Sequence, residues 1–466
     1  MKKLLKIYSL IAVLVLLVGM LFIVIPWQNF YRRDLTVIAT FALNGGVWGL
    51  LLFSELTKRA YSLIIIHWLF CFLFFFCIAF MQYMHGLFPW IGQRSDALIL
   101  QTNLILFIWT AFVWMGYKFA IPKKTFSSSI PNVIRIPLWL IVGLTTFTVI
   151  NTIYRVTSIG FSSLLSRATA AVSYGGNSSA VGLLLGNSLR SFAFFAVVFA
   201  LIYYRQNQKK LIFTVISFTC LLISYSPTAT ARFSAAATYG GLFIIMFPSL
   251  RKNRVFVLTL LTGFLVILPF FNVFRNTSFL DVNMFSAIQH VLKHLSDDWL
   301  AGDYDAYAML TLTVEHMQQY GITWGMQFLG VLLFWFPRAW WITKPIGTGA
   351  FIGTQLGWQF TNVSAPLPAE GLINFGMGYL LFAIVLGWIM GKLDKQYWNG
   401  LDTVGTNMRP YDLLYPAIIM LFFFMNRGDL LSSTAFTMAY VGVWFVLVSC
   451  CKTYKLNLVR NGTCKN

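Results

Sequence analysis

The 466-residue chain has little charge, because only 10% of its residues are Asp, Glu, Lys or Arg. A soluble domain usually carries about a quarter, so this scarcity argues against a soluble globular protein. Acidic residues are the scarcest, since 14 Asp and Glu stand against 34 Lys and Arg. Hydrophobic residues make up 58% of the chain. A composition of this kind is typical of a protein embedded in a bilayer.

Paired cysteines and long polar linkers are also missing. The six cysteines include no Cys-x-x-Cys pair, and none lies between residues 273 and 370. This distribution argues against a structural disulfide and against a zinc site, and we expect no metal and no other cofactor. The sequence has no internal repeat that can be recognised by eye, and no linker long enough to separate two soluble domains.

The chain is rich in apolar runs of membrane-spanning length, which is about 20 residues for a helix. We therefore predict an all-α, polytopic helical membrane protein with about 12 transmembrane helices. The predicted spans are Leu4–Ile25, Leu35–Ser54, Ser62–Phe80, Ala97–Lys118, Ile134–Tyr154, Ala180–Tyr204, Leu211–Tyr225, Phe233–Leu250, Val255–Asn272, Gly371–Gly391, Tyr411–Asn426 and Leu430–Cys451. We expect the first span to be retained, because its apolar run is too long for a signal peptide.

The basic residues predict the orientation of these helices. Pairs such as Lys58-Arg59, Lys123-Lys124 and Lys209-Lys210 fall in alternate loops, as Lys and Arg do on the cytoplasmic side of a membrane. We therefore expect both termini in the cytoplasm and residues 273–370 on the outer side. This loop pattern accounts for the net charge of +20, so nucleic acid is not an expected partner.

One long polar interruption divides the chain into three parts. Membrane helices 1–9 occupy residues 1–272, a large outer loop occupies residues 273–370, and three further helices with a cytoplasmic tail occupy residues 371–466. The loop holds seven of the 14 acidic residues, namely Asp281, Asp297, Asp298, Asp303, Asp305, Glu315 and Glu370. A membrane protein that gathers its acids in one extramembrane segment is expected to carry out recognition or chemistry there.

Two helical elements are predicted inside the loop. Apolar or small residues recur at helical spacing between Asp305 and Gln319, which predicts a helix that lies with one face on the membrane or on the bundle. Asp303 or Asp305 could cap its start. The aromatic run Trp324–Trp341 is predicted to be re-entrant or interfacial, because a full crossing would reverse the alternation of the loops.

Five cations are predicted at the outer ends of the helices, where loop-charge rules disfavour them. They are Arg232, Arg275, Arg338, Lys344 and Arg427. An Arg costs about 2.5–3.5 kcal/mol at a helix centre and less toward the interface, so a group of them indicates an anionic ligand. The planar fork of Arg matches phosphate oxygens two at a time and could stabilise a lipid-linked diphosphate as a leaving group. For any single cation the alternative is headgroup contact or an ion pair, such as Arg427 with Asp429.

Two acids are further candidates. Glu370 stands at the start of the tenth predicted span, where it could accept a hydroxyl proton; the alternative is an acid that favours the helix N-terminus electrostatically. Asp303-Tyr304-Asp305 is similar to the Asp-x-Asp that holds a metal-bound nucleotide sugar in some glycosyltransferases. Its predicted position on the outer side favours helix capping or solvation of the loop instead.

Two runs in the C-terminal half, Arg338–Ala350 and Asn362–Gly376, resemble bacterial oligosaccharide repeat-unit polymerases, the Wzy-type O-antigen polymerase family. The sites around Arg232, Arg275 and Arg427 fit the same pattern. The resemblance implies a GT-C-like helical fold in the bacterial inner membrane. It implies an undecaprenyl-diphosphate-linked oligosaccharide as substrate, with the growing glycan transferred onto a new lipid-linked unit at the outer leaflet. Membrane lipids and a chain-length regulator are the other implied partners.

Within this scheme each candidate residue has an expected role. Glu370 is the candidate base, and Arg232 and Arg275 are grouped with it as catalytic. The expected substrate-binding residues are Arg338, Lys344, Arg427, Asn374 and Asp305.

Two other functions fit the same composition. An O-antigen ligase would move the finished glycan from the same lipid to lipid A-core, and it shares the many-span architecture with a large outer loop. A flippase or other transporter would need charged residues at the bilayer midplane, where Arg190 is the strongest candidate.

Overall fold

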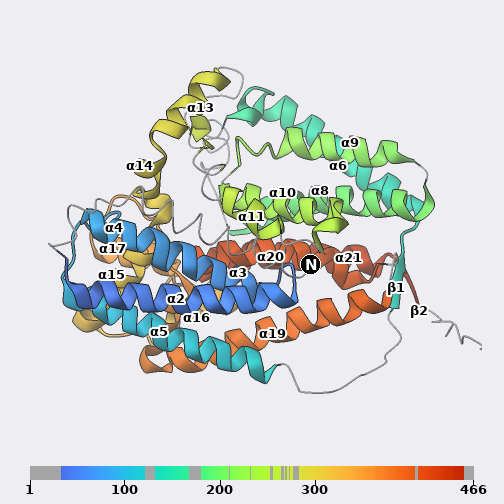
Figure 1. The fold of residues 1–466 in the computed structure, drawn as a ribbon. Helices are drawn as coiled ribbons and strands as arrows, with labels where there is room; N and C mark the ends of the chain where they lie inside the picture. The colour runs from blue at the N-terminus through green and yellow to red at the C-terminus, as the bar shows by residue number, and fades with distance from the viewer. Residues whose placement is uncertain are drawn as a thin grey trace, which may run out of the picture.

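The computed structural model describes residues 33–120, 132–166, 180–208, 210–230, 232–251, 255–263, 267, 270–271, 273–275, 283–404 and 408–455. In this part of the chain the fold is a bundle of helices with one small two-stranded sheet (Figure 1). Seven of the described helices are long and apolar enough to cross a membrane. The predicted class, an all-α membrane protein, is therefore confirmed. The total of 12 spans and the GT-C fold stay predictions, and the first predicted span, Leu4–Ile25, lies outside the described residues.

The bundle is built from helices that precede residues 273–370 in the sequence and from helices that follow Pro366. They are α2 (Leu35–Lys58), α3 (Leu63–Phe70), η2 (Cys71–Ile78), α4 (Ala79–His85), α5 (Asp96–Phe119), α6 (Leu138–Ile159), η3 (Ser163–Leu165), α8 (Ala180–Asn207), α9 (Leu211–Ser224), α10 (Arg232–Met246), η4 (Pro248–Arg251), α11 (Val255–Thr262), α18 (Leu367–Phe375), η8 (Gly376–Gly378), α19 (Tyr379–Val404), α20 (Pro410–Arg427) and α21 (Leu430–Ser449). The loop contains η6 (Val273–Arg275), α13 (Met284–Lys293), α14 (Leu295–Trp299), η7 (Gly302–Tyr304), α15 (Ala306–Tyr320), α16 (Met326–Leu332) and α17 (Thr348–Gln355).

Short polar side chains determine where several of the long helices begin. Asp34, Ser62, Ser95 and Asp429 precede α2, α3, α5 and α21, and each side chain accepts a hydrogen bond from a backbone N–H of the first turn. Such caps satisfy donors that the helix itself leaves unpaired. The helices therefore start where an apolar run follows a Ser or an Asp.

The bundle has two distinct ends. Residues 283–366 gather at one of them, here termed the loop end (Figure 1). There the side-chain amide of Gln82 in α4 donates to the carbonyls of Trp299 and Tyr304. At the opposite end, β1 (Asn132–Arg135) after α5 pairs antiparallel with β2 (Lys452–Lys455) after α21. This pairing agrees with the predicted alternation, which places the segments after α5 and α21 on one side. Which end faces the cytoplasm stays a prediction.

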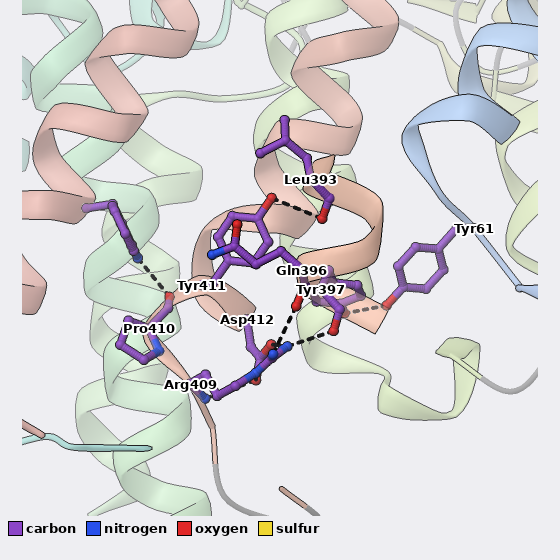
Figure 2. A network of polar contacts seen from close by, with 9 residues as sticks. Tyr61, Leu393, Gln396, Tyr397, Arg409, Pro410, Tyr411 and Asp412 are labelled. Carbon is purple, nitrogen blue, oxygen red and sulfur yellow. Dashed lines mark hydrogen bonds and ion pairs between the residues drawn. The ribbon is translucent and has the colours of Figure 1, made fainter. Parts of the chain in front are cut away.

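The α19–α20 connection at the opposite end is held by one arginine. The guanidinium of Arg409 donates to the carbonyls of Gln396 and Tyr397 and forms an ion pair of 2.6 Å with Asp412 (Figure 2). The hydroxyl of Tyr397 lies 2.7 Å from the hydroxyl of Tyr61, which connects this turn to the start of α3. These bonds hold the start of α20 against the C-terminal half of α19.

The C-terminal part of the loop is more deeply buried than expected. The predicted helix from Asp305 to Gln319 exists as α15, but every residue from Ala306 to Val314 is buried. It packs between α5, η2, α17 and α18, so the prediction of a helix resting on a surface with one face is wrong. The run Trp324–Trp341 contains only the short helix α16, which packs on α21 and α18 and leaves Trp324, Trp335 and Trp340 exposed.

Helices α5 and α19 approach each other through glycine. A Cβ on Gly116 of α5 would collide with the backbone of Ile384, and a Cβ on Gly387 of α19 would collide with the carbonyl of Val113. Small residues of this kind allow close backbone contact between membrane helices. The position of α19, which follows α18 after the short η8, therefore depends on these glycines.

We predict that Gly387→Ala destabilises the protein by about 1–3 kcal/mol, because the added methyl group forces α5 and α19 apart. Gly442→Ala in α21 is the matched control, since nothing lies within 4 Å of its Cβ position. Thermal unfolding in detergent measures both variants. Equal melting temperatures for the two would contradict the close contact.

Candidate functional site

The turn between α20 and α21 organises the loop end. Arg427 is the last residue of α20, and Asp429 caps α21, accepting from the backbone N–H of Ser432 at 2.8 Å. The carboxylate of Asp429 also lies against Gly347, where an added Cβ would be 2.6 Å from its Cγ atom. Two helices of the bundle and one loop segment therefore meet at this turn.

Arg427 connects the turn to the buried acid Asp305. Its guanidinium donates to the carbonyls of Asp303 and Gly302 and to Asp305 Oδ1, at 2.7, 3.1 and 3.0 Å. Asp305 is fully buried, and its Oδ2 atom accepts from Trp90 Nε1 and from the backbone N–H of Ser364. A buried charge is tolerated only when it is paired and hydrogen-bonded in this way.

Two sequence-based interpretations change here. Asp305 stands at the N-cap position of α15, but its carboxylate makes no capping bond, because it is turned toward Arg427 instead. The suggested ion pair between Arg427 and Asp429 is not formed, since Arg427 pairs with Asp305 while Asp429 caps α21. Both differences have the same physical cause. Arg427 and Asp305 form a buried ion pair with each other, so neither makes the contact that the sequence suggested.

Glu370 lies in the first turn of α18 and is 2% exposed. Its Oε2 atom accepts from the hydroxyl of Thr348 at 2.7 Å, and its Oε1 atom accepts from the backbone N–H of Leu430 at 2.8 Å. Leu430 is the first residue of α21, so the carboxylate lies at a helix N-terminus, where negative charge is favoured. Glu370 thus connects α18, α17 and α21.

Asn374 lies one turn after Glu370 and is also buried. Its side-chain amide donates to the Glu370 carbonyl at 2.9 Å, and its Oδ1 atom accepts from the backbone N–H of Phe328 in α16 at 2.8 Å. The backbone N–H of Gly325 donates to the Asn374 carbonyl. Asn374 therefore connects the start of α16 to the end of α18.

Arg338 and Lys344 stabilise the segment between α16 and α17 by hydrogen bonds to its own backbone. The exposed Arg338 donates to the carbonyls of Lys344 and Pro345 at 2.6 and 2.9 Å. The Lys344 ammonium donates to the carbonyls of Phe334 and Phe336 at 2.7 and 2.9 Å. Burial lowers the pKa of Lys344, and the charge of Arg338 lowers that pKa further. Each cation therefore already has polar partners within the protein.

Arg232 and Arg275 are placed by their backbones alone, since their side chains lie outside the described residues. Arg232 is the first residue of α10. Helix α10 runs against α20, because Gly240 contacts Met420 and Gly241 contacts Ala417. The start of α10 is thus at the loop end, about 12 Å along the helix from Gly240.

A second group of cations lies near the start of α10, of which the sequence analysis named only Arg190, as a candidate for a transporter. Arg155 of α6 and Arg190 of α8 lie over the ring of Tyr225, with their guanidinium carbons 4.5 and 5.3 Å from its centroid. Arg190 also donates to the hydroxyl of Ser234 in the first turn of α10. The sequence places Arg190 inside an apolar span and Arg155 directly after one, but it does not reveal that both contact Tyr225.

The loop end therefore combines two polar regions. One is a network of acids, cations and backbone groups around the α20–α21 turn, made by Asp305, Arg427, Thr348, Glu370 and Leu430. The other is the pair of arginines at Tyr225. A buried carboxylate can exchange a proton with a hydroxyl group, and guanidinium groups can bind oxyanions.

Comparison with known proteins gives no relative from which a role could be transferred. No protein-family model, no curated protein and no solved structure matches this chain. Its function is therefore argued from its own residues.

We predict that Arg427→Met destabilises the packing of residues 301–366 by about 3–5 kcal/mol, because it leaves the Asp305 carboxylate buried without its cation. Adding Asp305→Asn should recover part of this loss. The control is Arg94→Met, since the Arg94–Glu315 pair is partly exposed, at 29% and 30% of the side chains, and should contribute about 1 kcal/mol or less. Hydrogen exchange in nanodiscs measures all three, and similar protection in Arg427→Met and Arg94→Met would refute the prediction.

Proposed function

We propose that this protein is a membrane-embedded glycosyltransferase that polymerises undecaprenyl-diphosphate-linked oligosaccharide repeat units. The growing glycan leaves its lipid carrier and joins a newly supplied lipid-linked unit at the outer leaflet. This proposal joins the resemblance of residues 338–350 and 362–376 to repeat-unit polymerases with the polar loop end of the bundle. The observation that carries it is the position of Glu370, a buried carboxylate under the loop at the same end as Arg232.

A lipid-linked substrate accounts for the shape of the molecule. Its polyprenyl chain needs an apolar surface, and the bundle exposes large hydrophobic side chains such as Leu50, Ile150 and Leu381. Its sugars need polar partners, and the segment 283–366, which carries five of the acids, lies at one end of the bundle (Figure 1). A diphosphate at the junction would meet the start of α10, where the helix dipole favours an anion.

The proposed reaction transfers one glycosyl group. The acceptor hydroxyl oxygen bonds to the anomeric carbon, the bond from that carbon to the diphosphate oxygen breaks, and the lipid diphosphate leaves with the bonding electrons. The hydroxyl proton goes to a base, for which Glu370 is the candidate. Cations near the leaving group, with Arg232 and Arg275 foremost, would stabilise its negative charge.

The hydroxyl of Thr348 contacts Glu370 in the way that the proposal assigns to the acceptor hydroxyl. It donates to the carboxylate at 2.7 Å, as an acceptor sugar hydroxyl would. Both residues are buried, so helix α17 has to move for a sugar to take this place. Arg338 keeps a role in binding through donors that its two carbonyl bonds do not use, since a guanidinium has five N–H groups. Arg427 stays a candidate binding residue.

We predict that Glu370→Gln lowers chain extension by about 100-fold or more, because it removes the base while keeping an oxygen that can accept from Leu430. Thr348→Val is the control, since it removes one hydrogen bond but leaves the carboxylate. Glycan ladders from complemented deletion strains measure both, with the melting temperature as a check on folding. Normal ladders from Glu370→Gln would show that Glu370 is not the base and only connects α18 to its neighbours.

We further predict that Arg232→Ala and Arg275→Ala abolish chain extension while the protein still inserts into the membrane. Arg→Lys at either position should also impair it, because Lys lacks the planar fork. Lys452→Ala is the control, since Lys452 is exposed in β2 at the opposite end of the bundle. Near-normal ladders from both Ala variants would refute the assignment. A deletion strain with no glycan at all on lipid A-core would favour a ligase instead.

A further inference from the structure

The pair of arginines at Tyr225 has the features of a binding site. Arg155 is 9% exposed and Tyr225 is 4% exposed, so the contact between them is buried. Since both guanidinium carbons lie within 5.3 Å of one ring centroid, the two positive charges are at most about 10 Å apart, a range over which like charges repel strongly in a medium of low dielectric. Contact with the face of the tyrosine ring typically contributes about 0.5–2 kcal/mol for each cation.

The polar groups around this pair are only partly satisfied. Within the described part of the chain, the hydroxyl of Tyr225 and the Nε atom of Arg190 are buried and have no hydrogen-bond partner. No carboxylate among these residues forms an ion pair with Arg190. A buried donor without a partner costs about 1–3 kcal/mol. Unsatisfied donors beside the Arg190 guanidinium therefore indicate a missing acceptor, and an anion suits this position.

The surroundings of the pair add further donors and a helix N-terminus. Ser226, Thr228 and Thr230 are buried in the short connection between α9 and α10. Ser234, which accepts from Arg190, belongs to the first turn of the 15-residue helix α10. The connection is held in place, since Thr228 donates to the Leu165 carbonyl and the Thr230 N–H donates to the Ser226 carbonyl. The donors are thus fixed before any ligand arrives.

We infer that Arg155, Arg190 and Tyr225 form a binding site for a phosphate or diphosphate group. A tetrahedral oxyanion presents several acceptor oxygens, which suits two guanidinium groups, a phenol and a helix N-terminus. A carboxylate presents two oxygens, whereas a phosphate group presents three or four. The site lies on α6, α8, α9 and α10 and uses no residue of the segment 283–366. Assigning the phosphate to a lipid carrier rests on the proposed function, whereas the presence of an anion site does not.

The test uses the purified full-length protein in nanodiscs of phosphatidylcholine. Affinity is measured for two probes, undecaprenyl phosphate added to the nanodisc and inorganic pyrophosphate added to the buffer. Arg155→Gln and Arg190→Gln should each weaken binding about tenfold or more, and Tyr225→Phe should weaken it by a smaller factor. Arg33→Gln is the matched control, because Arg33 also lies over a tyrosine ring, 5.2 Å from the centroid of Tyr83.

The two probes separate the sources of the phosphate group. Binding of both supports a site for the anion itself, and binding of the lipid alone supports a lipid headgroup. Binding of neither probe, or equal affinity in Arg155→Gln, Arg190→Gln and Arg33→Gln, overturns the inference. Melting temperatures exclude misfolding, and Tyr225→Phe remains informative if an arginine variant fails to fold. Anion binding by a protein that extends no glycan would refute the proposed function and leave this site standing.

Discussion

The loop end depends on the ion pair between Arg427 and Asp305. It joins residues 122 positions apart in the sequence and connects the end of α20 to the start of α15. The same carboxylate fixes Trp90 and the backbone of Ser364, so three loop segments meet at one buried charge. From there the chain continues directly into α18, where Glu370 holds the first residue of α21. Without this ion pair, the segments that carry the polar residues around the α20–α21 turn would lose their common partner.

Local patterns made much of the helical framework predictable. The apolar runs gave starts for α2, α3, α5 and α21 that match the structure within one residue, and in the structure each of these helices follows a capping Ser or Asp. The end of the tenth span was harder, because α18 and α19 are separated at Gly376, with φ +54°, and α19 continues to Val404. The apolar pattern carries through this break, so periodicity alone does not reveal it.

The candidate site was only partly predictable, because its contacts are between distant residues. The sequence placed Glu370 and Arg427 at the outer ends of helices, and the structure brings both to the α20–α21 turn. It gave no indication that Lys344 would be buried beneath its own segment, or that Arg155 and Arg190 would share Tyr225. Charge and hydropathy indicate that an arginine needs a partner, but only the packing of helices determines which partner it finds.

The central claim is that this bundle transfers glycans between lipid carriers. The most direct measurement incubates the purified protein in nanodiscs with an undecaprenyl-diphosphate-linked repeat unit, without an ion gradient or any other protein. The account predicts lipid-linked dimers and longer oligomers, together with release of undecaprenyl diphosphate in equal number to the linkages formed. A repeat unit that stays at its original length, with no lipid diphosphate released, would contradict it.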